Sequence, residues 1–254
     1  ATLFTCLIFS VAFLVPIRHL IDGVILTIGN VPMEDVLLDT KNSIIVAGLG
    51  AFLIIVFSLV VGNFSRAVKH RFAKVLPKLT VLGYSIPGVV VAVAVITTFI
   101  ALDRFFAPVY QFFGVDSELV LSVNLFMLIS AYVIRFFAIG YNSIESGFDK
   151  IGTNFRDASR MLGANSLRTF FKIDVPMMKG AIISGFILVF VDILKEIPLT
   201  LILRPFNYDT LATKAFQYAS DEKIMEASQA SLLIVGVSTI AIFVFHKLLR
   251  EEPK

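Results

Sequence analysis

Six long apolar runs divide this chain, and each is about as long as a helix that crosses a membrane. A hydrocarbon core of ~30 Å needs about 20 mostly apolar residues per helix. The runs cover residues 3–28, 43–63, 79–102, 119–141, 180–203 and 228–249. None shows the strict alternation of polar and apolar residues that is typical of a barrel strand. The sequence therefore predicts an all-α fold, a polytopic bundle of six transmembrane helices forming one domain over residues 1–254.

The composition supports a membrane protein over the alternative of a very hydrophobic soluble one. Of the 254 residues, 57% are hydrophobic and 16% are charged, and the mean hydropathy is +0.87. A soluble domain is roughly 45–50% apolar and ~25% charged. Because the surface of a globule needs polar cover, such an excess does not fit inside one soluble core. The single Cys6 lies in the first run and forms no internal disulfide.

The basic residues predict how the helices are oriented. Fourteen of the 22 Lys and Arg follow the second, fourth and sixth runs, which lie on one side if the helices alternate. Basic residues accumulate on the cytoplasmic side of membrane proteins. We therefore expect both termini and the connection at residues 142–176 in the cytoplasm. This distribution accounts for the pI of about 9.0 without a nucleic-acid partner.

The stretch DASRMLGANSLRTFFKIDVP, residues 157–176, is polar although apolar runs flank it. Asp157 suits the N-terminal end of a helix dipole, and Gly163 suits the left-handed position that ends a helix. Ser166 is predicted to cap a second short helix, and Pro176 to open the following one. The residues predict a helix–turn–helix with two small apolar patches. It either rests on lipid headgroups or docks on another protein.

The same stretch resembles the EAA motif of ABC importer permeases, which reads E-A-A, three residues, G, nine residues, I-x-L-P. The matching positions are Asp157, Ala158, Ser159, Gly163, Ile173 and Pro176. The resemblance implies a type I permease of the bacterial inner membrane whose coupling loop, 142–176, docks on a cytoplasmic ABC ATPase dimer. The chain has no G-x-x-x-x-G-K-[ST] motif. It is therefore expected to be no enzyme and to bind no cofactor, with ATP and Mg in the partner subunit.

Charged residues inside the fifth run predict a second site. Asp192, Lys195 and Glu196 are spaced to share roughly one helix face, and Pro198 breaks the helix after them. Charges inside a membrane helix usually face the bundle interior or a water-filled path. One interpretation is an ion-pair lock between helices. The other is an acidic translocation path in which Asp192 and Glu196 are metal ligands for a hard cation such as Fe³⁺.

This region resembles ferric-iron importer permeases, which carry D-x-L-K-E-x-P-x-T-L-x-L-R-P-F followed by D-T-L-A. The matching positions are Asp192, Leu194, Lys195, Glu196, Pro198, Thr200, Leu201, Leu203, Arg204, Pro205 and Phe206, then Asp209, Thr210, Leu211 and Ala212. The resemblance implies Fe³⁺ as substrate. In that family the permease is often a fused protein of two six-helix halves. This chain resembles the second half, so a second permease half is an expected partner, whether fused or in a homo- or heterodimer.

The outer segment after the fifth run is the predicted docking site of a periplasmic substrate-binding protein, as the resemblance implies. Its candidate residues are Tyr208, Asp209, Tyr218, Asp221 and Glu222. The alternative is a solvated loop without a partner. Other cargoes of the same importer class are thiamine, polyamine, phosphonate or an oxyanion, although an anion path should prefer basic residues or helix N-termini. A membrane scaffold without transport is the alternative of another class.

Overall fold

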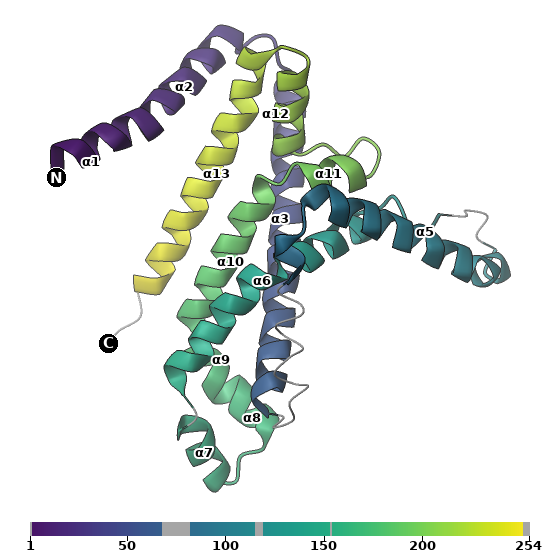
Figure 1. Ribbon diagram of the computed structural model, residues 1–254, viewed down its shortest axis with the longest axis vertical. Coiled ribbons are helices and arrows are strands. Elements are labelled where there is room, and N and C mark those ends of the chain that lie inside the picture. Colours follow the sequence, from purple (N-terminus) through teal and green to yellow (C-terminus); the bar gives the residue numbers. More distant parts are fainter. Residues whose placement is uncertain (1, 68–81, 115–118, 153, 251–254) are drawn as a thin grey trace.

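The structure, a computed structural model, describes residues 2–67, 82–114, 119–152 and 154–250, and every regular element within them is a helix (Figure 1). The elements are α1 Thr2–Phe9, η1 Ser10–Leu14, α2 Val15–Thr27, α3 Met33–Ala67, η2 Leu82–Ser85, α5 Gly88–Phe112, α6 Leu125–Ile151, α7 Asn154–Met161, α8 Ser166–Thr169, η3 Phe170–Asp174, α9 Val175–Met177, α10 Lys179–Leu194, α11 Pro198–Leu203, α12 Leu211–Ser220 and α13 Ile224–Arg250. The all-α prediction is confirmed.

Helices α3, α6 and α10 form the centre of the bundle, and α13 packs against α10 and α12 (Figure 1). Their close approach depends on residues without a side chain. A Cβ on Gly50 would lie 2.8 Å from Ile193 Cδ1, one on Gly140 would lie 2.6 Å from Ile54 Cγ2, and one on Gly147 would lie 2.6 Å from Ala181 Cβ. Helices in lipid associate through such contacts because hydrocarbon provides little hydrophobic drive between them.

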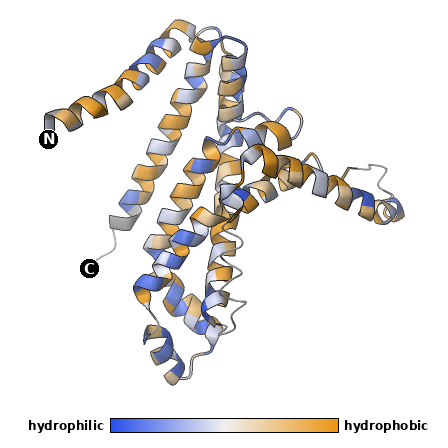
Figure 2. Cartoon of the chain, viewed as in Figure 1, coloured by the Kyte–Doolittle hydropathy of each residue, from blue (hydrophilic) through white to orange (hydrophobic). Residues whose placement is uncertain are grey.

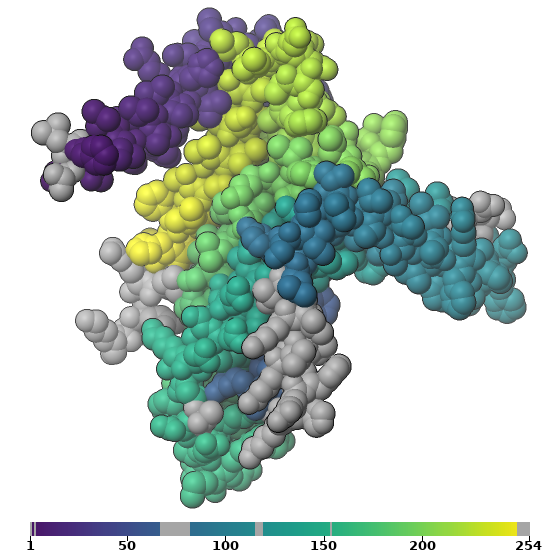
Figure 3. All heavy atoms as spheres, viewed as in Figure 1, coloured from purple at the N-terminus to yellow at the C-terminus, as the bar shows by residue number. Residues whose placement is uncertain are grey.

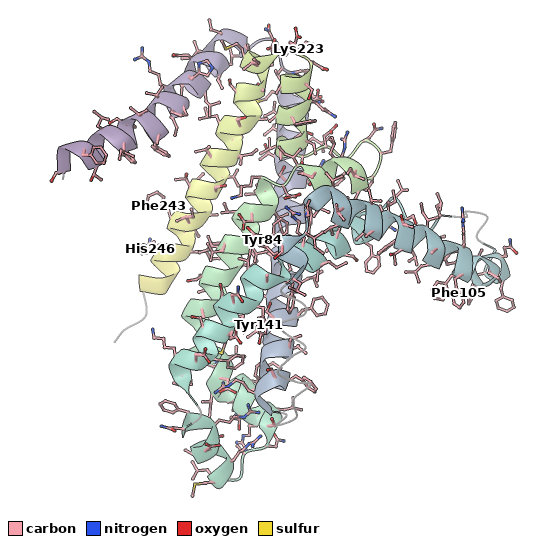
Figure 4. The ribbon with its side chains drawn as sticks, in the orientation of Figure 1. Tyr84, Phe105, Tyr141, Lys223, Phe243 and His246 are labelled. Carbon is pink, nitrogen blue, oxygen red and sulfur yellow. The ribbon has the colours of Figure 1, made fainter. Side chains whose placement is uncertain are left out.

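Two parts project from this bundle in opposite directions, the arm made by α1, η1 and α2, and the helix α5 (Figure 3). The C-terminal end of the arm joins the bundle, and there the Thr27 hydroxyl lies 3.5 Å from the Met225 carbonyl oxygen of α13. Large apolar side chains are exposed on both projections, including Phe4 at 70% and Phe105 at 75%, the latter labelled in Figure 4. Figure 2 shows the apolar residues along the long helices. Such surfaces suit contact with hydrocarbon or another subunit rather than water.

Among the described residues, five helical stretches are long and apolar enough to cross a bilayer. The pair Ser166–Met177 and Lys179–Leu194, bent by 71°, brings the total to six if it counts as one span. Five of the six predicted runs thus correspond to such a helix, and the fifth run corresponds to the bent pair. Helix α3 has 35 residues and is about 52 Å long, so its polar outer end extends beyond a ~30 Å hydrocarbon core.

The predicted starts of the third and fourth spans are wrong. Helix α5 begins at Gly88 rather than 79, because Pro87 has extended backbone angles of φ −55° and ψ 138°; residues 79–81 lie outside the described part. Helix α6 begins at Leu125 rather than 119. The residues before it are irregular, and the buried Asp103 carboxylate accepts hydrogen bonds of 2.8 Å from the backbone N–H groups of Leu121 and Ser122.

The fifth span is also shorter than predicted. Helix α10 ends at Leu194, and a break of three residues separates it from α11, which begins at Pro198. The predicted break at the proline is therefore confirmed, although the helix ends four residues before it. The connection between the fourth and fifth spans is also shorter than the predicted loop 142–176, because α6 continues to Ile151.

Candidate coupling surface and broken span

The polar segment made by α7, α8, η3 and α9 lies at the end of the bundle opposite the α12–α13 turn (Figure 1). Gly163 has φ +82°, as the sequence predicted. The Ala164 N–H donates to the Ser159 carbonyl at 3.1 Å, and the Gly163 N–H donates to the Arg160 carbonyl at 3.0 Å. This pair of bonds is a Schellman motif, which satisfies carbonyls at the end of α7 and requires a left-handed residue at Gly163.

The two short helices are held together by polar groups, of which Arg156, Ser159 and Thr169 are buried. The hydroxyls of Ser159 and Thr169 lie 2.9 Å apart, and Arg156 donates to the Ser166 hydroxyl at 3.3 Å. The prediction that Ser166 caps α8 is wrong, because the Asn165 side chain accepts the capping bond from the Arg168 N–H at 2.8 Å. Burial and the neighbouring Arg160 lower the pKa of Arg156, and Asp174 opposes them. An arginine remains protonated under these conditions.

Phe170 attaches this segment to the bundle, and Arg66 joins α3 to the adjoining end of α6. Phe170 is buried in a cluster with Ile144 and Phe148 of α6. Arg66, at the end of α3, donates to the Gly152 carbonyl at 2.6 Å and lies 4.6 Å above the Phe148 ring. The end of α6 that leads toward the helix–turn–helix is therefore fastened to α3 by Arg66, and Phe170 packs the segment against α6.

Several large apolar side chains of the segment are exposed. Met161 and Leu162 are 90% and 89% exposed. Leu167 and Phe171 are exposed as well, and these four residues are called the apolar patch. Phe155 is also exposed, but it lines a groove with Lys150 of α6 and Met177 of α9. Of the remaining predicted coupling residues, Asp157, Ala158 and Pro176 are exposed and Ile173 is half-buried. An exposed apolar patch on a polar segment is typical of a protein interaction site. Phe155 was missed in the sequence because it lies just before the recognised motif.

The acidic residues of the fifth span do not share one face, so that prediction is wrong. Because α10 ends at Leu194, the helical spacing between Asp192 and Glu196 is lost. Asp192 pairs with Lys195 at 2.8 Å, and both line a groove of ≈ 490 Å³ with Ile242 and His246 of α13. Figure 4 labels His246 near the C-terminal end of α13.

Glu196 points toward other helices and is only 8% exposed. Its Oε2 lies 3.7 Å from Nε of Arg135 in α6, and its Oε1 accepts a hydrogen bond of 3.2 Å from the Leu199 N–H. The described residues hold no group of three or more His, Cys, Asp or Glu that could bind a metal ion. The geometry thus matches the ion-pair alternative for Glu196. Arg135 was missed, although it is a lone charge within the fourth run.

The predicted docking residues fall into two separate places. Tyr208 and Asp209 are half-buried against α3: the Tyr208 hydroxyl lies 3.4 Å from the Asn42 carbonyl oxygen, and the Asn42 amide donates to the Asp209 carbonyl at 3.0 Å. Asp209 also pairs with Arg204. Burial raises the pKa of the Tyr208 hydroxyl. These contacts fix the loop to the third turn of α3, at Asn42.

The other three residues lie along α12 and at its end. Tyr218 is half-buried beside Lys214, whose amine is 5.7 Å from the ring centre. Asp221 and Glu222 are exposed in the turn before Lys223, which Figure 4 labels at the end of the bundle. Helix α12 has ten residues and is about 15 Å long, so it separates the two places. Of the five predicted docking residues, Asp221 and Glu222 are the ones with exposed carboxylates.

The family model for binding-protein-dependent transport system inner membrane components matches residues 54–251. The chain belongs to this family. Proteins similar to the chain include an Fe(3+)-transport system permease protein of Haemophilus influenzae, 24% identical over 207 residues, which are 82% of this chain and 38% of that protein. A molybdate/tungstate transport system permease protein of Methanocaldococcus jannaschii is 26% identical over 163 residues, 64% of this chain and 62% of that protein.

Solved structures with a similar fold include two ABC transporters. A bacterial ABC transporter involved in the import of the acidic polysaccharide alginate has a TM-score of 0.73 at 16% identity, over 100% of this chain and 94% of that chain. The MetNI methionine ABC transporter in an inward-facing conformation has a TM-score of 0.64 at 14% identity, over 87% of this chain and 98% of that chain. The fold is therefore that of ABC importer permeases. The chain spans less than two fifths of the length of the ferric relatives it matches.

Proposed function

We propose that the chain is a permease half of an ATP-driven importer that moves ferric iron into the cytoplasm of a bacterium. The observation that carries the importer assignment is the apolar patch on α7, α8 and η3, presented by the Gly163 turn at one end of the bundle. A separate ATPase dimer docks on this patch, and ATP binding and hydrolysis there move the segment. A second permease half completes the translocation path.

Orientation follows from the charges of the sequence. The segment made by α7, α8, η3 and α9, here called the docking segment, carries basic residues, which accumulate on the cytoplasmic side. Because six spans alternate in direction, both ends of the chain then lie in the cytoplasm as well. The α12–α13 turn then faces the periplasm, where its carboxylates at Asp221 and Glu222 are available to a binding protein. One structural neighbour, the alginate transporter, was solved in complex with a periplasmic protein that binds its cargo.

Ferric iron is supported by the ferric-type sequence of the broken span and by three relatives named as ferric permeases. A second candidate cargo is an oxyanion, since other relatives are named as molybdate/tungstate permeases. One structural observation favours this second candidate. Each carboxylate of the broken span is already paired with a cation, Asp192 with Lys195 and Glu196 with Arg135, so the region carries no excess negative charge.

Uptake into vesicles tests the proposal. The vesicles hold the permease, its ATPase and its binding protein, and receive either radioactive Fe³⁺ or radioactive molybdate. We expect ATP-dependent uptake of iron, and we expect Glu196→Gln to lower it severalfold because the buried Arg135 charge is then left without its counter-ion. The matched change Asp192→Asn should have less effect, since its partner Lys195 is exposed to solvent or headgroups.

The outcomes separate the candidates. Molybdate uptake without iron uptake would replace the cargo and keep the importer. If uptake falls equally in Glu196→Gln and Asp192→Asn, transport requires the negative charge of both residues and not specifically the ion pair with Arg135. A complex that neither binds an ATPase nor transports would contradict the importer assignment and favour the scaffold.

A further inference from the structure

Arg135 contacts two different segments from one position on α6. Its side chain is 18% exposed, and a charge inside a membrane-spanning helix is costly unless it has partners. Nη1 donates a hydrogen bond of 2.9 Å to the carbonyl of Ile86, just before α5. Nε lies 3.7 Å from the Glu196 carboxylate, between α10 and α11. The guanidinium therefore joins the two places where the spans are interrupted.

The start of α5 is shaped to receive this ion pair. A Cβ on Gly88 would lie 2.9 Å from Nη1 of Arg135 and 3.1 Å from Oε1 of Glu196. Glu196 also accepts a hydrogen bond from the Leu199 N–H in the first turn of α11. The carboxylate thus lies near the first turns of two helices, where the helix dipoles favour a negative charge.

A second contact from α6, one turn away, strengthens the attachment. The hydroxyls of Tyr132 and Thr200 lie 2.5 Å apart, and the Thr200 hydroxyl donates to the Glu196 carbonyl at 2.8 Å. Helix α6 therefore fixes α11 through Tyr132 and through Arg135. At its other end α6 leads directly into the docking segment through Gly152, whose carbonyl accepts a hydrogen bond from Arg66.

The Arg135–Glu196 pair is suited to opening. The Nε atom of Arg135 is buried and has no hydrogen-bond partner in the described part of the protein, so the pair lacks the forked geometry of the strongest arginine–carboxylate pairs. Separating a single ion contact of 3.7 Å costs less interaction free energy than breaking two parallel hydrogen bonds would. The Tyr132–Thr200 contact, by contrast, is short and fully buried.

We propose that Arg135 is a positioning residue of the transport cycle, a latch whose contacts with Glu196 and Ile86 hold α5 and α11 in the resting arrangement. Movement of the docking segment reaches the latch along α6, and its opening lets α5 move relative to α11. The inference rests on the proposed function, but it does not depend on which cargo is carried. It differs from the acidic-path interpretation, because Glu196 here serves Arg135 rather than the cargo.

The test measures ATPase activity of the reconstituted permease–ATPase complex with and without the binding protein. In the wild type we expect the binding protein to stimulate hydrolysis strongly. In Arg135→Gln we expect the rate of ATP hydrolysis without the binding protein to rise by roughly tenfold, which corresponds to an activation free energy lower by ~1.4 kcal/mol. We expect uptake to fall in the same variant. Arg104→Gln is the matched control, since Arg104 is an exposed position of α5.

The exchange Arg135→Glu with Glu196→Arg adds a second readout. If the ion pair is the latch, the double variant should recover at least part of the stimulation by the binding protein that each single change removes. A wild-type response in Arg135→Gln would overturn the proposal. So would a fall in both ATPase activity and assembly without any gain of unstimulated hydrolysis, because a merely structural role produces that result. A wild-type complex without any ATPase activity would instead refute the proposed importer.

Discussion

Replacing Gly163 with valine is expected to abolish ATP-driven uptake and leave the helix bundle folded. Gly163 has φ +82°, where an L-residue costs about 1–2 kcal/mol and a β-branched one more. The substituted chain can relieve this strain by opening the Schellman turn between α7 and α8. The apolar patch would then lose its shape, because Met161 and Leu162 precede the turn and Leu167 follows it.

The magnitude is measured as the amount of ATPase that copurifies with the permease. A loss of more than about 1.4 kcal/mol in docking free energy lowers the affinity at least tenfold. Gly163→Asn is the matched control, since asparagine tolerates the left-handed region. A Cβ at Gly163 meets no atom within 4 Å, so asparagine has space and should keep most of the docking. Normal copurification and uptake with valine would contradict the assignment of this segment as the coupling surface.

The turn at Gly163 was predictable from sequence because local backbone chemistry determines it. A glycine between two short polar-apolar stretches needs no tertiary contact to end a helix, and the spacing to Ile173 and Pro176 identified the segment. The attachment of the adjoining end of α6 to α3 through Arg66 was not predictable in the same way. Its contacts with Gly152 and Phe148 join residues more than 80 positions apart.

The broken span shows where extrapolation from helical spacing fails. Asp192 and Glu196 share a face only if the helix continues between them, and it ends at Leu194. Pro198 predicted a break, because a proline has no N–H to donate to the carbonyl four residues earlier, that of Leu194, and its ring clashes with that carbonyl. The partner of Glu196 lies on α6, 61 positions earlier, so only the packed structure could show that the carboxylate faces Arg135 rather than Asp192.

Replacing Gly50 with leucine is expected to prevent the bundle from folding. Gly50 lies on α3 against Ile193 of α10, and a Cβ there would lie 2.8 Å from Ile193 Cδ1 and 3.7 Å from the Tyr132 ring. The Ile193 methyl could yield to one added carbon, but leucine adds four heavy atoms to a core whose neighbours are almost fully buried. Overpacking typically costs about 1–3 kcal/mol, and more where close-packed helices must separate.

Gly48→Leu is the control, two residues earlier on the same helix. A Cβ at Gly48 meets no atom within 4 Å, so the leucine would point away from the bundle. Because leucine favours helix over glycine by up to ~1 kcal/mol, this variant should fold as well as the wild type or better. The measurement is the yield of monodisperse protein after detergent extraction, with its thermal stability. We expect the Gly50 variant to lose at least about tenfold in yield. Equal yields of the two variants would show that α3 and α10 do not pack through Gly50. The broken span, whose Ile193 and Leu194 pack in the same core, would then be held in place by other contacts.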